Sequence, residues 1–200
     1  MSLIILEGLP GASKTLFGKS YVAAHENAIF LEEWVDEKVL KEYLENMKEK
    51  ATSFQFYIQE ETVNRIKKAS ELVKEGKIVV LDRGILGNSC FAFIQNDAAI
   101  ISDQDMKTYY DRFSYENIPG FKDIKSSTLY LKATPEFCLE RIRKRERAGE
   151  SVYDLNYLNQ LAGTHNALLE NTKVCHITKD YPLNSLGLLS TSSLLEILSS

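Results

Sequence analysis

The sequence is poor in the features that mark several classes of protein. Its three cysteines, Cys90, Cys138 and Cys175, are widely spaced, so they offer neither a disulfide framework nor a CxxC metal site. No apolar run approaches the roughly 20 residues that a membrane span needs. The beginning of the chain has no basic region followed by an apolar stretch. We therefore expect a cytoplasmic protein without a membrane span or a secretory signal.

The sequence also lacks a large excess of either positive or negative charge. Lys and Arg number 24 against 28 Asp and Glu, a net charge of -4, so we expect neither a nucleic-acid partner nor a membrane surface. The three histidines have no metal-ligand spacing, which argues against a histidine metal cage. With 44% hydrophobic and 26% charged residues, the 200-residue chain has the composition of a globular protein, and we expect a single domain over 1–200.

Short apolar runs alternate with helical patterns along the chain. This alternation is typical of a parallel sheet with helices on both faces, and we predict an α/β fold with a five-stranded parallel sheet in three layers. The five predicted strands cover 2–7, 28–31, 77–81, 127–131 and 173–177. The clearest helical patterns cover 13–24, 35–47, 53–73 and 154–169, with Gly76 as a stop signal and Pro135 in the first turn of a further helix.

The first strand runs into a phosphate-binding pattern. The segment Gly8-Leu9-Pro10-Gly11-Ala12-Ser13-Lys14-Thr15 resembles the P-loop G-x-x-x-x-G-K-[ST] and lies between a strand and a helix, as that motif requires. Glycines let backbone amides approach a phosphate, Lys14 would reach the β- and γ-phosphates, and the Thr15 hydroxyl would hold Mg²⁺. Ser13 departs from the pattern, which has glycine there, and its Cβ is expected to crowd the ATP phosphates or restrict the loop.

Polar residues follow two further strands. Glu32 and Glu33 come after the second strand, and Asp82 and Arg83 after the third. In open parallel sheets ligands bind beyond the carboxyl ends of the strands, so one cleft is expected to hold these residues and the glycine loop. A carboxylate in that cleft can accept the proton of a substrate hydroxyl. Helix-capping acids and a structural ion pair are the simpler alternatives.

Several segments together resemble the deoxynucleoside kinase family. The P-loop preceded by Glu7 is one, and 54–57 (Phe-Gln-Phe-Tyr) matches the family's F-Q-x-Y. The segment 82–85 (Asp-Arg-Gly-Ile) stands where the family has E-R-S-I or D-R-H. An arginine-rich stretch from Arg141 is followed by the family's helix after the lid, and the resemblance covers about 3 to 170. It implies the three-layer P-loop kinase fold and transfer of the ATP γ-phosphate to a nucleoside 5′-hydroxyl.

The resemblance also implies roles for single residues near the reacting groups. Glu32 is expected to be the catalytic base, with Glu33 as the alternative because the proline that follows the family's glutamate is missing. Asp82 is expected to hold Mg²⁺ together with Thr15. Arg83 is expected to contact the acceptor's 5′ oxygen and the transferred phosphoryl group.

Other residues are expected to bind the nucleoside. The side-chain amide of Gln55 can make paired hydrogen bonds to a base, and Phe91 or Phe93 is expected to stack on it. Tyr43 is expected to reach the sugar 3′-hydroxyl. Each of these side chains has a plainer alternative as part of a helix face or of the core.

Arginines 141, 143 and 145 are expected to bind ATP from a lid over about 141–152 that also contains Arg147. At helical spacing these side chains cannot all share one face. A solvated basic helix end is the alternative. Family members are often dimers, so the resemblance also suggests a homodimer.

Two departures leave the base and the sugar open. Gly163 stands where the family's glutamate for the 3′-hydroxyl is expected, and Asn88 and Ser89 replace an arginine of the family. One alternative is a nucleoside monophosphate kinase of the thymidylate kinase type. Residues 57–60 lack the arginine that such enzymes use for the acceptor phosphate, and Arg65 is expected to be too far along the helix. A nucleotide-binding module without catalysis is the other alternative.

Overall fold

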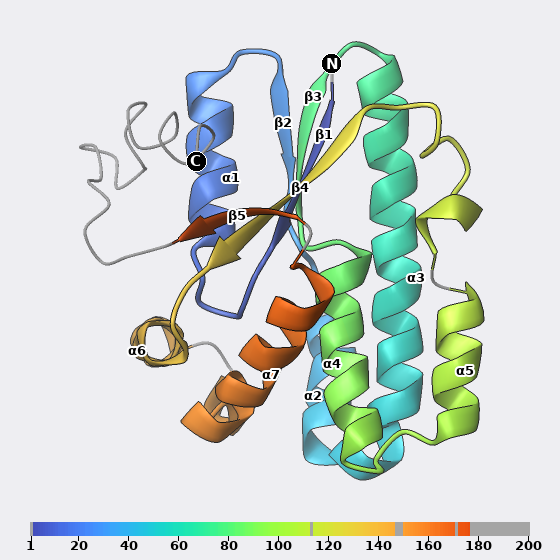
Figure 1. Cartoon of the computed structure of the whole chain (residues 1–200), viewed down its shortest axis with the longest axis vertical. Helices are drawn as coiled ribbons and strands as arrows, with labels where there is room; N and C mark the ends of the chain where they lie inside the picture. The colour runs from blue at the N-terminus through green and yellow to red at the C-terminus, as the bar shows by residue number, and fades with distance from the viewer. Residues whose placement is uncertain (1, 113, 147–149, 171, 177–200) are drawn as a thin grey trace.

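One parallel sheet organises the chain (Figure 1). The computed structural model describes residues 2–112, 114–146, 150–170 and 172–176. The first part forms β1 (Leu3–Glu7), α1 (Lys14–Ala24), β2 (Ala28–Leu31), α2 (Glu37–Glu45), α3 (Met47–Lys74) and β3 (Ile78–Asp82). The second part forms α4 (Ile85–Asp97), α5 (Asp103–Arg112), η1 (Tyr115–Asn117), β4 (Ser126–Lys132), α6 (Pro135–Arg145), η2 (Glu150–Val152), α7 (Leu155–Leu168) and β5 (Lys173–His176).

The strands pair in the order β2-β3-β1-β4-β5, and every pair is parallel. The predicted five-stranded parallel sheet is therefore confirmed. From central β1 the chain runs first to β2 and β3 on one side and later to β4 and β5 on the other. Leu6 lies opposite Asp82 of β3, and Glu7 lies opposite Tyr130 of β4. The carboxyl end of β1 is thus the switch point at which ligands bind in such sheets.

The apolar side chains of the sheet divide between two cores. Ile4 and Leu6 pack with residues of α1, α6 and α7, whereas Leu3 and Ile5 pack with residues of α3 and α5. Successive side chains of a strand point to opposite faces, so a strand that is apolar throughout supplies both cores. All five residues of β1 are buried, and Figure 1 shows α1 and α3 on opposite sides of the sheet. This confirms the predicted three layers.

The boundary between α2 and α3 differs from the prediction of helices over 35–47 and 53–73. The Asp36 side chain accepts the backbone N–H groups of the first turn, so α2 begins directly after it. α3 already begins at residue 47, and its Ser53 hydroxyl donates to the Lys50 carbonyl inside the helix at 3.0 Å. A serine that bonds to its own helix does not begin a new one, and this explains the error.

The predicted end of α3 at Gly76 is confirmed. Gly76 has a φ of 92°, and its N–H donates to the Val73 carbonyl at 3.0 Å. The N–H of Lys77 donates to the Leu72 carbonyl, also at 3.0 Å. These two bonds form a Schellman motif, which favours glycine because of the left-handed backbone. Pro135 begins α6, as the sequence indicates.

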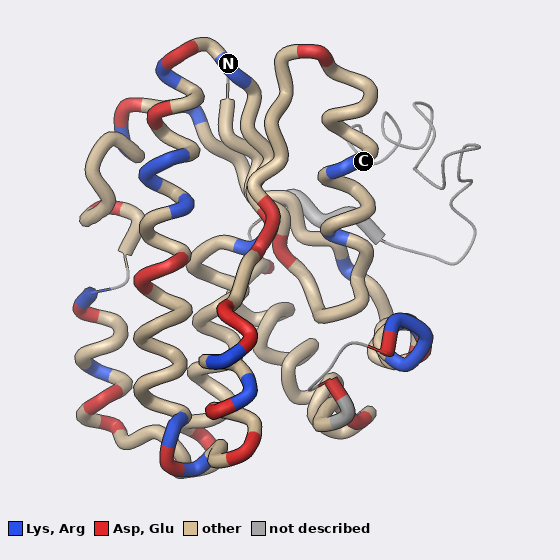
Figure 2. Tube along the Cα trace, turned by 180° about the vertical axis from the view of Figure 1, so that it is seen from behind, with Lys and Arg blue, Asp and Glu red and all other residues tan. Residues whose placement is uncertain are grey.

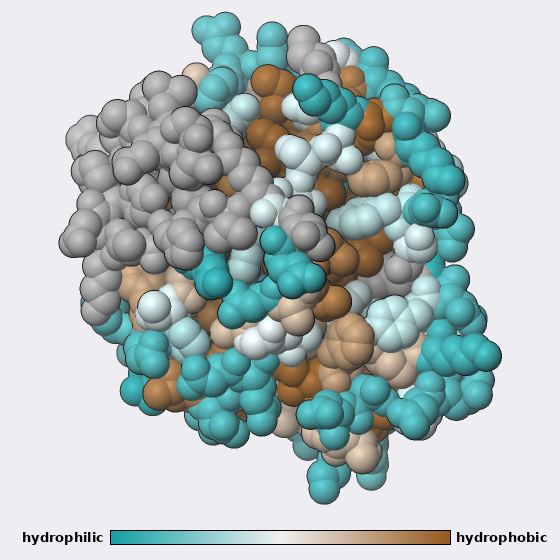
Figure 3. Space-filling view, viewed as in Figure 1, coloured by the Kyte–Doolittle hydropathy of each residue, from teal (hydrophilic) through white to brown (hydrophobic). Residues whose placement is uncertain are grey.

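The surface of the described residues carries no large region of a single charge in the view of Figure 2. Figure 2 shows acidic and basic residues interspersed over the helices, with a basic end on α6. Figure 3 shows hydrophilic side chains at the margins of one face and hydrophobic ones near its middle. Within the described ranges, no helix is long and apolar enough to span a membrane. Cys90 and Cys138 are buried free thiols.

Replacement of Leu131 tests the importance of the central sheet for stability. Leu131 of β4 is fully buried, so Leu131→Ala leaves a cavity and is expected to lower the free energy of unfolding by about 2–5 kcal/mol. Leu155→Ala, at a side chain that is 38% exposed, is the control and is expected to change it by less than about 0.5 kcal/mol. Urea unfolding measures both. Equal losses would contradict this account of the core.

Candidate active site

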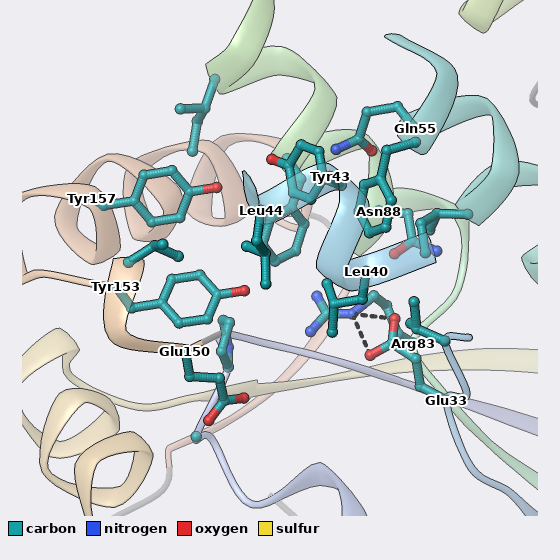
Figure 4. A pocket seen from close by; sticks show the side chains of 18 of the residues that line it. Glu33, Leu40, Tyr43, Leu44, Gln55, Arg83, Asn88, Glu150, Tyr153 and Tyr157 are labelled. Carbon is teal, nitrogen blue, oxygen red and sulfur yellow. Dashed lines mark hydrogen bonds and ion pairs between the residues drawn. The ribbon is translucent and has the colours of Figure 1, made fainter. Parts of the chain in front are cut away.

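A cavity of about 440 Å³ lies at the carboxyl ends of the strands, a volume typical of small-molecule sites. Its walls come from the loop after β1, the segment after β2, and helices α2, α3, α4, α6 and α7. The sequence-predicted residues that line it are Gly11, Ser13, Lys14, Thr15, Glu32, Tyr43, Gln55, Asp82, Arg83, Phe91, Arg141 and Arg145. The predicted cleft is therefore present, with a charged end and an apolar end (Figure 4).

The glycine loop is built for close backbone packing. Gly8 and Gly11 have φ values of 147° and 83°. A Cβ at Gly8 would lie 2.6 Å from the Leu131 carbonyl oxygen, and one at Gly11 would lie 2.6 Å from the Cys138 carbonyl oxygen. Both positions therefore require glycine. Ala12 is fully buried behind the loop, where it packs into the core.

Ser13 has the backbone that its motif position requires. Its φ of 71° is left-handed, and it precedes Lys14, the first residue of α1. A residue with a Cβ is strained in this conformation, typically by about 1–2 kcal/mol. The Ser13 side chain makes no capping hydrogen bond that would offset the strain. The serine that replaces the glycine of the P-loop motif is thus a strained residue at the start of α1.

Lys14 turns back onto its own loop. Its Nζ donates to the carbonyl oxygens of Gly8 and Leu9, both at 3.1 Å, and the residue is 7% exposed. Burial, and then the positive charge of Arg83, lowers the pKa of Lys14 to about 8. Burial disfavours the charged ammonium group. The negative charge of a polyphosphate beside it would stabilise that charged form.

Thr15 and Asp82 form an oxygen-rich pair. The Thr15 hydroxyl donates to Asp82 Oδ2 at 2.9 Å, and Asp82 Oδ1 is buried without a hydrogen-bond partner among the described residues. Burial raises the pKa of Asp82, because the charged form lacks solvent. Mg²⁺ prefers hard oxygen ligands and usually takes only one or two from protein. These two residues therefore fit Mg²⁺ held jointly with phosphate oxygens.

The two glutamates after β2 have different surroundings. The Glu32 side chain is 52% exposed, and its carboxylate lies 3.7 Å from the Lys19 ammonium. Glu33 is half as exposed, and both of its oxygens lie within 3.1 Å of Arg83 Nε (Figure 4). Burial alone would raise the pKa of Glu33, but Arg83, Arg65 and Lys14 together lower it. Both glutamates line the cavity, but Glu33 is the one that contacts Arg83 at its charged end.

Arg83 is held in an unusual backbone conformation. Its φ is 63°, and its side chain is 5% exposed. The guanidinium lies 4.9 Å from the centre of the Phe91 ring, and Nη1 lies 3.5 Å from the Gly8 carbonyl oxygen. Burial disfavours its charge, but Glu33, Glu7 and Asp82 outweigh this and raise the pKa of Arg83. Arg83 is thus a permanent cation between the phosphate loop and Glu33.

Fully buried Glu7 and partly buried Arg65 fix the turn from 82 to 84, and sequence reasoning missed the role of both. Arg65 of α3 donates to the carbonyl oxygens of Asp82 and Arg83 at 2.6 and 3.4 Å. Glu7 of β1 accepts the Gly84 N–H at 3.1 Å from the other side. The left-handed backbone of this turn is therefore bonded through both its carbonyl and its amide groups.

Glu7 is fully buried below this turn. Its Oε2 has no hydrogen-bond partner among the described residues, and a Cβ at Gly87 would lie 2.0 Å from that atom. Burial raises the pKa of Glu7 to about 7, although Arg83 opposes the shift. Glu7 is thus a carboxyl group that takes up a proton near neutral pH.

The apolar end of the cavity contains side chains of α2, α3 and α4. Tyr43 stacks on Phe54 with ring centres 4.1 Å apart, and Gln55 is 4% exposed. Phe91 lines the cavity, whereas Phe93 packs against Tyr110 on α5. Of the two candidates for stacking on a base, only Phe91 is placed for it.

Helix α2 contributes one wall of this end. None of its residues is buried, although its side chains Leu40, Tyr43 and Leu44 line the cavity. Figure 4 shows Tyr153 and Tyr157 opposite them, with hydroxyl groups directed toward the cavity. These two tyrosines were not predicted as site residues, and helical spacing could not pair them, because Tyr153 lies before α7 and Tyr157 within it.

The arginines of α6 separate as helical spacing requires. Arg141 and Arg145 line the cavity, whereas Arg143 lines a surface hollow with Glu140 and Glu146 instead. The prediction that Arg143 binds ATP therefore lacks geometric support. Arg145 pairs with Glu150, a cavity residue that sequence reasoning also missed.

Two other sequence assignments fall elsewhere. Gly163, at the place of the family's sugar-binding glutamate, is not among the described residues that line the cavity, and a Cβ there would meet no atom of the described residues within 4 Å. Of the predicted lid, residues 147–149 with Arg147 lie outside the described residues.

The strain at Ser13 gives a test with a matched control. Ser13→Gly removes the Cβ and is expected to raise the free energy of unfolding by up to about 1 kcal/mol and to tighten ATP binding. Ser13→Ala keeps the Cβ and is expected to show neither gain. Urea unfolding and calorimetric titration with ATP measure the two effects. Equal behaviour of both variants would show that the Cβ is not the cause.

Glu7 predicts a pH-dependent stability. Folding raises its pKa from the usual 4.5 to about 7, so its contribution to stability is fully present below pH 4.5 and is lost as the pH rises to 7. Glu7→Gln mimics the protonated group and is expected to gain roughly 2–3 kcal/mol over the wild type between pH 5 and pH 8. Urea unfolding at both pH values measures this gain, with the exposed Glu26→Gln as the charge control. A constant difference between Glu7→Gln and the wild type would refute the buried-acid assignment.

Comparison with known sequences agrees with this site. The sequence pattern of the family "Deoxynucleoside kinase" matches residues 4–186. A deoxyadenosine kinase of Dictyostelium discoideum is 27% identical over 168 residues, which cover 84% of this chain and 66% of the relative. A deoxyguanosine kinase of the same organism is 29% identical over 175 residues, covering 86% and 60%. The chain thus spans about two thirds or less of the length of these relatives.

Solved structures share the fold. A deoxyadenosine kinase from M. mycoides with bound dCTP superposes with a TM-score of 0.71, at 19% identity, over 98% of this chain and 96% of the other. The same enzyme with dCMP and dCDP gives a TM-score of 0.75 with the same identity and coverage. The fold is therefore that of P-loop kinases. Together with the match over residues 4–186, this shows that the chain belongs to the deoxynucleoside kinase family.

Proposed function

We propose that this protein transfers the γ-phosphate of ATP to the 5′-hydroxyl of a deoxynucleoside and releases the monophosphate and ADP. The observation that carries the proposal is the Glu33–Arg83 pair, with Arg83 Nε 3.0 Å from Glu33 Oε1, where the phosphate loop meets the apolar end of the cavity. A hydroxyl bound at this junction lies between a proton acceptor and a phosphate-binding cation. Membership of the deoxynucleoside kinase family supports the same assignment.

The charged end fits a nucleotide donor. The loop amides and the start of α1 supply positive potential for the phosphates, and Lys14, Arg141 and Arg145 add three cations. Thr15 and Asp82 would hold Mg²⁺, which when bound neutralises charge on the phosphates. Lys14 Nζ bonds to the Gly8 and Leu9 carbonyl oxygens, which holds this cation within the loop that would bind the phosphates.

The transfer step uses the pair at the junction. Glu33 accepts the proton of the 5′-hydroxyl while the 5′ oxygen forms its bond to the γ-phosphorus. The bond from that phosphorus to the β–γ bridging oxygen breaks, and ADP leaves. Arg83, fixed by its turn, stabilises charge on the transferred group. Glu33 is preferred to the predicted Glu32 because it is less exposed and contacts Arg83.

The apolar end fits a nucleoside without a phosphate. Among the described residues, the cations that line the cavity are Lys14, Arg83, Arg141 and Arg145, and they belong to the phosphate loop, the 82–84 turn and the lid helix α6. Arg65 is bonded to backbone carbonyls and does not line the cavity, so it does not serve an acceptor phosphate. This favours a nucleoside over a monophosphate acceptor. Gln55, Tyr43 and Phe91 are the side chains that would contact base and sugar.

Phosphate transfer to a panel of deoxynucleosides, ribonucleosides and their monophosphates tests the proposal. We expect transfer to deoxynucleosides, and Glu33→Gln is expected to lower kcat by about 10²- to 10⁴-fold. Glu32→Gln is the matched control and is expected to stay near the wild-type rate. Asp82→Asn is expected to abolish transfer while ATP still binds.

The same assays distinguish the alternative catalytic base, the alternative acceptor and a protein without catalysis. Loss of activity in Glu32→Gln alone would place the base at Glu32. Transfer only to monophosphates would overturn the proposed acceptor, and ATP binding with no transfer would overturn the proposed catalysis.

Self-association as a homodimer is a separate proposal from family resemblance, and sedimentation of the purified chain tests it.

A further inference from the structure

Three polar side chains from three helices join at the apolar end of the cavity. Gln55 Nε2 of α3 lies 3.1 Å from Gln95 Oε1 of α4, and Gln95 Nε2 lies 2.5 Å from the Tyr43 hydroxyl of α2. Gln55 and Gln95 are 4% and 6% exposed, and all three side chains line the cavity. They form a continuous chain of hydrogen bonds beside the position proposed for the base.

This chain controls the direction of the Gln55 amide. A glutamine side chain has two N–H donors and one carbonyl acceptor, and Gln55 gives one N–H to Gln95. The other N–H and Oε1 remain as a donor–acceptor edge for a ligand. Because the bond to Gln95 fixes which end of the amide is nitrogen, Gln95 determines the order of donor and acceptor along that edge.

The Tyr43 hydroxyl permits either direction, since it can donate or accept. In the structure it accepts from Gln95, which then accepts from Gln55. If the hydroxyl donates instead, both amides can turn over together, and Gln95 donates to Gln55 Oε1. Every hydrogen bond of the chain is kept in both states. Two opposite edges are thus available without the loss of a hydrogen bond within the chain.

The two edges correspond to two classes of base. Adenine and cytosine present an amino donor next to a ring nitrogen acceptor. Guanine and thymine present a carbonyl acceptor next to a ring N–H donor. The order of donor and acceptor therefore divides the bases into amino and keto classes, independently of whether they are purines or pyrimidines.

We propose that Gln95 and Tyr43 are positioning residues that set the direction of the Gln55 amide and let this one site accept both amino and keto bases. The inference rests on the proposed function, because it takes the apolar end as the base site. It explains why a side chain as polar as Gln95 is buried beside an apolar cavity without facing the phosphates.

Replacement of Gln95 by glutamate tests the relay. At pH 8 a carboxylate only accepts, so Gln95→Glu holds Gln55 in the observed direction. The ratio of kcat/KM between amino and keto deoxynucleosides is expected to change by about tenfold, and equally within the purine pair and the pyrimidine pair. Gln95→Met keeps the size but has no polarity, and it is expected to lower all four values while leaving the ratio near that of the wild type.

Tyr43→Phe is a second variant for which the relay predicts the direction of change in the amino-to-keto ratio of kcat/KM. Without the hydroxyl, the observed direction leaves a buried N–H of Gln95 unpaired, whereas the turned direction leaves a carbonyl oxygen unpaired, which proteins tolerate better. The amino-to-keto ratio is expected to move opposite to that in Gln95→Glu. A shift that follows ring size, or an equal loss for all four nucleosides in both variants, would overturn the relay.

Calorimetric binding of the four deoxynucleosides to the same proteins separates the two proposals. If the wild type transfers phosphate to no nucleoside, the proposed function fails, but the binding ratios still report the direction of Gln55. If transfer occurs and the ratios do not move, the relay fails and the proposed function stands.

Discussion

The left-handed turn at Arg83 is the constraint on which the site depends. It directs Asp82 toward Thr15 and the Arg83 side chain toward Glu33, so one backbone conformation places both the pair proposed to hold Mg²⁺ and the pair proposed for the transfer step. Such a conformation costs about 1–3 kcal/mol for a residue with a side chain. The bonds from Arg65 and Glu7 hold it in place. Glu7 is fully buried and Arg65 is partly buried, so the free energy needed to remove these two ionisable groups from water is part of the cost of the site.

Much of the fold could be predicted because it depends on local patterns. Five short apolar runs indicated the strands, and Gly76 indicated the end of α3 through its left-handed backbone. The glycine loop was found from its motif, and Asp82 and Arg83 were expected beside it because a parallel sheet brings strand ends to one edge. The start of α3 was missed because Ser53, which resembles a helix start, bonds inside a longer helix instead.

The remaining parts of the site depend on contacts across the fold. Whether Glu32 or Glu33 pairs with Arg83 depends on how the chain leaves β2, and no periodicity there decides between adjacent residues. Glu7 and Arg65 reach the turn from β1 and α3, so their partners are far away in sequence. The separation of Arg143 from its neighbours did follow from helical spacing, but which face meets the cavity did not.

The wall formed by α2 has a consequence for the thermodynamics of the site. Within the described part of the chain every other α-helix has buried residues, but α2 has none, and its Leu40, Tyr43 and Leu44 border the cavity. A molecule that fills this space supplies the apolar contact that the protein itself does not give the helix. The ligand thereby acts as a missing piece of hydrophobic core, and the stability of the protein becomes a measure of how full its cavity is.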